Sequence, residues 1–118
     1  MSLETQSSSP SPLSDAFTCE VQPERGAVRV FALGSLDVAT GPALDAQLEE
    51  LRDAGFRRLI VDLSKLGFMD STGLRLLLKW DAEARQDGFS IELVPGPPAV
   101  QRVFETTGTA GLLPFVNS

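Results

Sequence analysis

An apolar run, a leucine-rich segment and a second apolar run follow one another between residues 58 and 94, and this succession constrains the fold more than any other feature. Residues 58–63, RLIVDL, are nearly all apolar, which is typical of a central parallel strand buried on both faces. Residues 71–86 have the spacing of an amphipathic helix, and residues 89–95, FSIELVP, alternate between apolar and polar. Strand, helix and strand make a βαβ unit, so we expect parallel strands and a right-handed crossover.

Further strands and helices are predicted on both sides of this unit. Residues 17–21 and 27–33 alternate between apolar and polar side chains around the turn sequence PERG, which indicates a hairpin. Recurring leucines predict a helix over residues 41–54, which Thr40 can cap and Gly55 can end. The segment PPAVQRVFETTG predicts a final helix. The predicted order is ββαβαβα, an α/β fold with a mixed β-sheet, and the apolar tail GLLPFV is expected to pack against it.

The N-terminal segment MSLETQSSSPSPLSD differs in composition from the rest of the chain, with six serines, two prolines and almost no large apolar side chains. Such a segment buries too little apolar surface to offset the entropy of ordering. Residues 1–15 are therefore predicted to be a disordered tail, and residues 16–118 to form one domain. No apolar run approaches the roughly 20 residues of a membrane-spanning helix, and no signal-peptide pattern is present. We expect a cytoplasmic protein without membrane insertion.

Several kinds of chemistry are excluded by what the chain lacks. Without histidine, the Ser-His-Asp and Cys-His forms of catalysis are impossible, and the commonest transition-metal ligand is missing. No G-x-x-x-x-G-K-[ST] loop is present to hold nucleotide phosphates. We therefore expect no enzymatic activity, no metal and no cofactor. The formal charge of −6 repels nucleic acid and anionic membranes, and it favours a partner with a basic docking surface.

The sequence FMDSTGL, residues 68–74, lies where a strand ends and a helix begins, which is where regulatory and ligand sites of such sheets are found. Three interpretations compete. An aspartic-protease triplet is excluded, because glycine stands three residues after Asp70 and no second copy exists. Asp70 or Ser71 can cap the helix, since both side chains accept backbone N–H groups. Alternatively, Ser71 accepts a phosphate, which the free N–H groups and the dipole of a helix start would tolerate.

These segments resemble the STAS domains of bacterial anti-sigma factor antagonists, from about residue 17 to residue 116. Residues 68–74 are similar to the phosphoacceptor motif of that family, Asp-Ser-Ser/Thr-Gly-Leu. Residues 34–37, GSLD, are similar to the family's Gly-Glu-Leu-Asp, and residues 99–112 are similar to its final helix and closing Gly-Leu. The resemblance implies a STAS-like mixed sheet with helices packed on it.

The resemblance also implies a partner-switching function. The unphosphorylated antagonist would bind an anti-sigma factor serine kinase and so release a sigma factor for transcription. The kinase would use its own ATP to phosphorylate Ser71, with Thr72 as the alternative acceptor, and a phosphoserine phosphatase would reset the switch. The residues expected to bind the partner are Asp37, Asp70, Thr72, Gly73, Leu74, Arg75 and Leu78. The alternative is a constitutive STAS interaction module, such as a scaffold or a transporter-associated subunit, in which no kinase acts.

Two positions depart from the family pattern. Ser35 stands where glutamate is usual, which removes a charge from the loop near the expected docking site. Arg75 replaces a common glycine, and it either pairs with the phosphate, selects a particular kinase, or is a solvated helix residue.

A helical projection of residues 71–86 adds an expectation that the family match does not contain. The predicted core face consists of Gly73, Leu76, Leu77, Trp80 and Ala84. Leu74 and Leu78 fall on the same flank as Ser71. They either pack against a neighbouring helix or form an exposed apolar patch that anchors a partner.

Overall fold

The computed structural model describes residues 17–116. The predicted tail, residues 1–15, lies outside the described residues. The strands are β1 (Thr18–Glu24), β2 (Ala27–Leu36), β3 (Arg58–Asp62), β4 (Leu66–Met69) and β5 (Ser90–Val94). The helices are α2 (Gly41–Asp53), α3 (Ser71–Asp87) and α4 (Pro98–Thr107).

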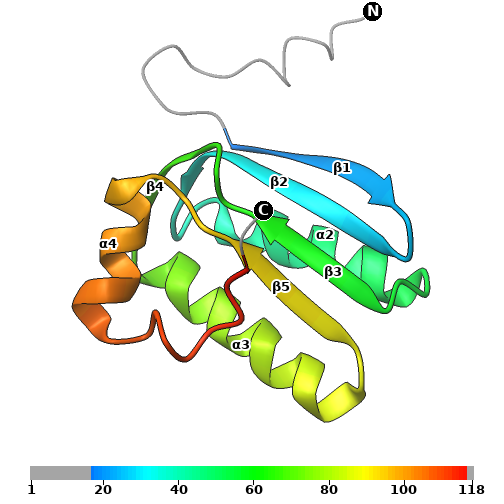
Figure 1. Cartoon of the computed structure of the whole chain (residues 1–118). Coiled ribbons are helices and arrows are strands. Elements are labelled where there is room, and N and C mark those ends of the chain that lie inside the picture. The colour runs from blue at the N-terminus through cyan, green and yellow to red at the C-terminus, as the bar shows by residue number, and fades with distance from the viewer. Residues whose placement is uncertain (1–16, 117–118) are drawn as a thin grey trace, which may run out of the picture.

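The strands form one mixed sheet in the order β1-β2-β3-β5, and the helices lie on one of its faces (Figure 1). The pairing of β1 with β2 is antiparallel, whereas β2 with β3 and β3 with β5 are parallel. This arrangement confirms the predicted hairpin, the βαβ unit and the mixed α/β fold class. Of the helices in the described part, none is both long and apolar enough to cross a membrane.

The short strand β4 is an addition to the predicted order. It pairs in parallel with the end of β2, beyond the part of β2 that β3 occupies. A turn after Leu63, closed by the Leu66 N–H donating to the Leu63 carbonyl at 3.0 Å, brings the chain back beside β2. Because β4 leads directly into α3, its pairing fixes where that helix starts.

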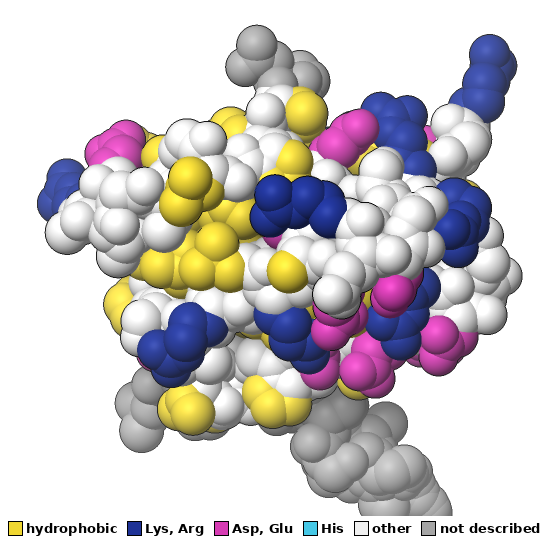
Figure 2. Space-filling model, turned by 90° about the horizontal axis from the view of Figure 1, so that it is seen from below, with side chains coloured by type: hydrophobic (Ala, Val, Ile, Leu, Met, Phe, Trp, Pro, Cys, Tyr) yellow, Lys and Arg dark blue, Asp and Glu magenta, His cyan; other side chains and the backbone are white. Residues whose placement is uncertain are grey.

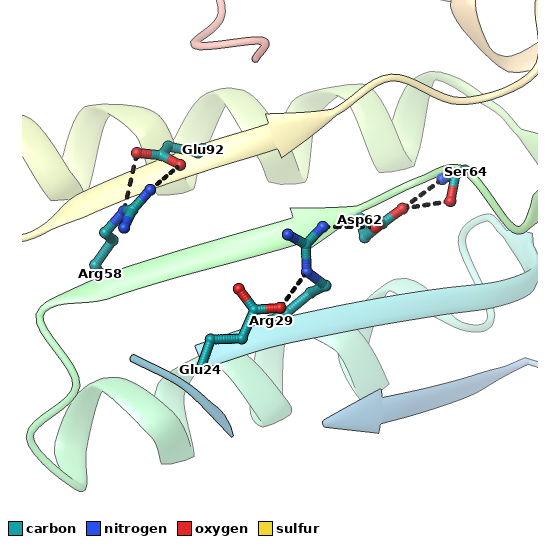
Figure 3. A network of polar contacts seen from close by, with 6 residues as sticks. All are labelled: Glu24, Arg29, Arg58, Asp62, Ser64 and Glu92. Carbon is teal, nitrogen blue, oxygen red and sulfur yellow. Dashed lines mark hydrogen bonds and ion pairs between the residues drawn. The ribbon is translucent and has the colours of Figure 1, made fainter. Parts of the chain in front are cut away.

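Alternating side chains on the strands divide the sheet into a core face and an outer face. Val28, Val30 and Ala32 of β2 belong to the core beneath the sheet. Between them, Arg29 points to the outer face, where it pairs with Glu24 and Asp62 (Figure 3). The strand period of two therefore produces an apolar face for the helices and an outer face where these ion pairs lie beside a small buried apolar cluster of Ala27, Ile60 and Val94.

The end of the described chain packs against the sheet and α4, as the apolar tail predicted. Leu113 is buried, and Phe115 bridges to Leu93 of β5. The ring of Phe115 lies edge-on to Phe104, with 4.9 Å between ring centroids. This contact closes the core at the end of β5.

Candidate functional site

The start of α3 is capped by Asp70, so the choice between Asp70 and Ser71 is resolved in favour of the aspartate. Asp70 has extended backbone angles, φ −110° and ψ −169°, and its Oδ1 accepts from the Thr72 N–H at 2.8 Å. Its own N–H donates to the Leu36 carbonyl at 3.2 Å, which ties the cap to β2. The cap is thus positioned by the sheet as well as by local sequence.

Ser71 is the first residue of α3, and its side chain is exposed. Within residues 17–116 no hydrogen bond holds its hydroxyl, so neither the helix cap nor the core depends on it. Thr72 is half-buried and faces Gly41 of α2. Of the two neighbouring hydroxyl residues, Ser71 is therefore the more open to solvent.

Gly73 lies under the motif at a point of close packing. A Cβ at this position would stand 2.6 Å from Met69 Cγ and 2.9 Å from Leu36 Cδ2. Only glycine lets α3 approach β2 and β4 this closely. Gly73 is buried, in keeping with its close packing between α3 and the strands.

Asp37 holds the loop between β2 and α2. Its Oδ1 accepts from the N–H groups of Ala39 at 3.0 Å and Thr40 at 3.2 Å. The Thr40 hydroxyl donates to the Ser35 carbonyl at 2.7 Å and accepts from the Asp37 N–H at 2.9 Å. The side-chain cap predicted for Thr40 is therefore absent, because the loop already uses that hydroxyl.

A groove of about 350 Å³ lies between the first turns of α2 and α3. Its walls consist of Val38, Gly41, Pro42, Asp45, Thr72, Arg75, Leu76 and Lys79. The sequence analysis did not predict that Val38 and Leu76 line a groove beside the motif. Val38 is 74% exposed, and an apolar residue in a polar loop was the available signal.

One carboxylate ties the two helices together beside the groove. Asp45 Oδ1 of α2 accepts from Lys79 Nζ and from Trp80 Nε1 of α3, both at 2.8 Å. Burial raises the pKa of Asp45, but the hydrogen bonds from Lys79 and Trp80 outweigh it, so the pKa lies below the ordinary value. The hydrogen bond to Asp45 raises the pKa of Lys79. Lys79 is thus a charged residue of the groove wall that is already paired with Asp45.

The core face of α3 predicted by the helical projection is confirmed for Gly73, Leu77, Trp80 and Ala84, which are buried. Leu74 is only 6% exposed and belongs to the core, so its side chain is not available as a partner anchor. Leu78 is half-buried and packs against the same core. Leu76, predicted to be in the core, is half-buried: it packs against the core and also lines the groove.

The two departures from the family pattern have different surroundings. Ser35 is buried on β2, and its carbonyl accepts from Thr40, so this position is part of the fold rather than an exposed docking residue. Arg75 is exposed on the groove wall, and no ion pair joins it to another described residue. Arg75 is therefore the departure that a partner or a phosphate could meet.

The helix side of the molecule also has a second hollow. Figure 2 views this side and shows hydrophobic side chains gathered toward the left, with acidic and basic side chains mixed over the right. A hollow of about 280 Å³ lies on α4, lined by Ala99, Arg102, Val103, Thr106 and Thr107. None of these residues comes from the motif at 68–74, so the groove beside Ser71 is the better candidate site.

The amino-acid sequence is similar to that of known STAS-domain proteins. A family model described as "Mlab, STAS domain" matches residues 19–114. BtrV of Bordetella bronchiseptica is 34% identical over 85 residues, which are 72% of this chain and 73% of BtrV. The anti-sigma-B factor antagonist of Staphylococcus aureus is 34% identical over 80 residues, which are 68% of this chain and 74% of that protein.

Solved structures agree with these relatives. An anti-sigma factor antagonist from Mycobacterium paratuberculosis has a TM-score of 0.73 at 25% identity, over 87% of each chain. SpoIIAA in its unphosphorylated form has a TM-score of 0.69 at 25% identity, over 87% of this chain and 88% of SpoIIAA. Bacillus SpoIIAA in the phosphorylated form shares the fold, with a TM-score of 0.64 at 24% identity, over 87% of this chain and 91% of that one. This chain belongs to the STAS-domain family of anti-sigma factor antagonists.

Proposed function

We propose that this protein is an anti-sigma factor antagonist whose binding is switched by phosphorylation of Ser71. In the unphosphorylated state it binds an anti-sigma factor kinase, and a sigma factor is released in the cytoplasm. The kinase transfers a phosphoryl group from its own ATP to Ser71, and a phosphatase removes it. The groove between α2 and α3 and the exposed start of α3 form the docking surface.

The main support for this proposal is that the Ser71 side chain is exposed and that its hydroxyl makes no hydrogen bond within the described residues. Asp70 supplies the helix cap, so the hydroxyl of Ser71 has no structural task in the described part of the chain. The names of the relatives support the antagonist function, and SpoIIAA is described in both unphosphorylated and phosphorylated forms. Ser71 rather than Thr72 is the acceptor, because Thr72 is half-buried in the groove wall.

A phosphate on Ser71 would change docking more than folding. It adds about −1.5 to −2 charges beside Asp70, at a helix start whose free N–H groups and dipole favour an anion. The added charge lies at the rim of an interface that must lose water on binding, where an unmatched charge is costly. We therefore expect the phosphorylated protein to fold normally and to release its partner.

The test combines the protein with its cognate anti-sigma kinase and ATP and follows phosphate uptake by mass spectrometry. Wild type and Thr72→Ala should gain one phosphate, and Ser71→Ala should gain none. Binding, measured by calorimetry, should be retained by Ser71→Ala and weakened by Ser71→Asp. Phosphate uptake by Ser71→Ala but not by Thr72→Ala would assign the acceptor to Thr72 instead.

The same experiment separates the switch from a constitutive STAS module. A module without a switch would take up no phosphate, and Ser71→Asp would bind its partner as tightly as wild type. That pair of results would contradict the proposed function while leaving the family assignment intact.

A further inference from the structure

Arg75 lies close to Ser71 on α3 and also lines the groove. It follows Ser71 by four residues on α3, so the two side chains lie one turn apart on the same face, with Cβ atoms about 6 Å apart. Side chains of an α-helix lean toward its N-terminus, so the long side chain of Arg75 can reach back over the turn that contains Ser71. Arg75 also lines the groove wall.

No acidic side chain on α3 competes for Arg75. The residues three and four positions away along the helix are Ser71, Thr72, Leu78 and Lys79, none of which is a carboxylate. No ion pair to another element is formed within residues 17–116. Arg75 therefore keeps an exposed charge, without an ion pair in the described part of the chain, one helical turn from Ser71.

The other cation on the groove wall, Lys79, is already paired with a carboxylate. Lys79 Nζ donates to Asp45 Oδ1 at 2.8 Å, so this pair contributes no net charge to the groove. The carboxylate of Asp70, which would repel a phosphate, is engaged by the Thr72 N–H. Arg75 is thus the cation on this wall that is free to turn toward a new anion.

The same helix already contains an ion pair with this spacing. Asp81 Oδ2 accepts from the Arg85 guanidinium at 2.7 Å, with the acid four residues before the arginine. A phosphate on Ser71 would stand before Arg75 in the same order and at the same spacing. A phosphate accepts from an arginine through two parallel hydrogen bonds, which strengthens such a pair.

We propose that Arg75 is the residue of the groove that responds to phosphorylation: a phosphate on Ser71 binds the Arg75 guanidinium and takes its charge from the docking surface. This inference rests on the proposed function and deepens it. With Ser71 unmodified, Arg75 offers the groove a cation for a carboxylate of the partner that lies beside an apolar side chain held by Val38 and Leu76. Phosphorylation then acts twice, by adding an anion and by removing that cation.

The experiment uses the full chain with phosphoserine incorporated at position 71 during translation, so it does not require the kinase. The second pKa of the phosphate is measured by ³¹P NMR titration in the wild type, Arg75→Gln, Arg75→Lys and Arg102→Gln backgrounds. A cation that pairs with the dianion lowers its pKa, so we expect Arg75→Gln to raise the phosphate pKa by about 0.2–0.4 unit. Arg75→Lys should give an intermediate value, and Arg102→Gln, an exposed substitution on α4, should match wild type.

Equal phosphate pKa values in the wild-type and Arg75→Gln backgrounds would overturn the pairing. Equal rises in Arg75→Gln and Arg102→Gln would also overturn it, because they would indicate a general effect of net charge. A kinase that leaves Ser71 unmodified would contradict the proposed function and not this pairing, since the phosphoserine here is introduced independently.

Discussion

At the scale of single residues, Gly73 is the motif position that the fold can least replace. A Cβ there would lie 2.6 Å from Met69 Cγ and 2.9 Å from Leu36 Cδ2, and both neighbours are buried. Alanine gains about 1 kcal/mol in helix propensity, but forcing a methyl into a filled core costs about 1–3 kcal/mol. We expect Gly73→Ala to lower the free energy of unfolding by about 1 kcal/mol, measured by urea denaturation with Trp80 fluorescence.

Gly41 provides the matched control at the start of α2. A Cβ there would meet Thr72 Cγ2 at 3.5 Å, which is an ordinary contact. Gly41→Ala should therefore keep or slightly raise the free energy of unfolding. If both alanine variants have the wild-type midpoint, close packing is not the reason for glycine in the motif.

The sequence restricted the cap of α3 to two residues but could not choose between them. Asp70 and Ser71 are both good N-cap residues, and they are adjacent. The choice depends on which residue has extended backbone angles, and the pairing of β4 with β2 imposes those angles on Asp70. This pairing joins segments more than thirty residues apart, so local spacing does not contain it.

At the scale of elements, Asp45 controls how α2 and α3 are held. Asp45→Ala removes the acceptor of Trp80 Nε1, and a buried donor without a partner costs about 1–3 kcal/mol. Asp45→Asn keeps an oxygen for Trp80 and loses the charge that attracts Lys79, so it should cost less. Urea denaturation of both variants at neutral pH measures the difference. Equal losses would mean that the charge, not the Trp80 hydrogen bond, holds the helices.

The lowered pKa of Asp45 should also make the free energy of unfolding depend on pH. Its pKa in the folded protein is below the ordinary value of about 3.9, because hydrogen bonds from Lys79 and Trp80 outweigh burial. Its stabilising effect is therefore complete above that ordinary value and is lost as the pH falls through the folded pKa. The difference in unfolding free energy between wild type and Asp45→Asn should shrink below about pH 4.

The elements themselves were largely predictable, and the exceptions have clear physical causes. The long periodic segments of α2 and α3 and the apolar run of β3 could be located from spacing alone. Strand β4 was missed because four residues that include Gly67 are too few to establish alternation. Whether Leu74 is buried depends on the elements that pack beside α3, which a projection of one helix does not contain.

At the scale of the whole molecule, the formal charge of −6 does not describe the charge of the groove wall. It favoured a basic partner, yet the groove wall presents Arg75 and Lys79, with Asp45 already neutralised by Lys79. Many of the charges lie elsewhere, including the paired network on the outer face of the sheet (Figure 3). Net charge averages over both faces, whereas a partner meets only one.

This separation of faces predicts that stability and partner binding can be changed independently. On the outer face, Arg29 pairs with Asp62, whose side chain is 5% exposed, so Arg29→Ala leaves a buried carboxylate without its cation. The expected loss in the free energy of unfolding is about 2–4 kcal/mol. The Arg58 side chain is 48% exposed, and losing its pair with Glu92 should cost under about 1 kcal/mol.

Neither outer-face substitution should alter affinity for the anti-sigma factor under conditions where the variant is folded. On the helix face the pattern reverses, because Ser71→Asp and Arg75→Gln change exposed side chains that support no core contact. They should weaken partner binding and leave the unfolding free energy within about 0.5 kcal/mol of wild type. Urea denaturation and calorimetry on the four variants test this together. Weaker binding by folded Arg29→Ala would show that the outer face of the sheet takes part in docking.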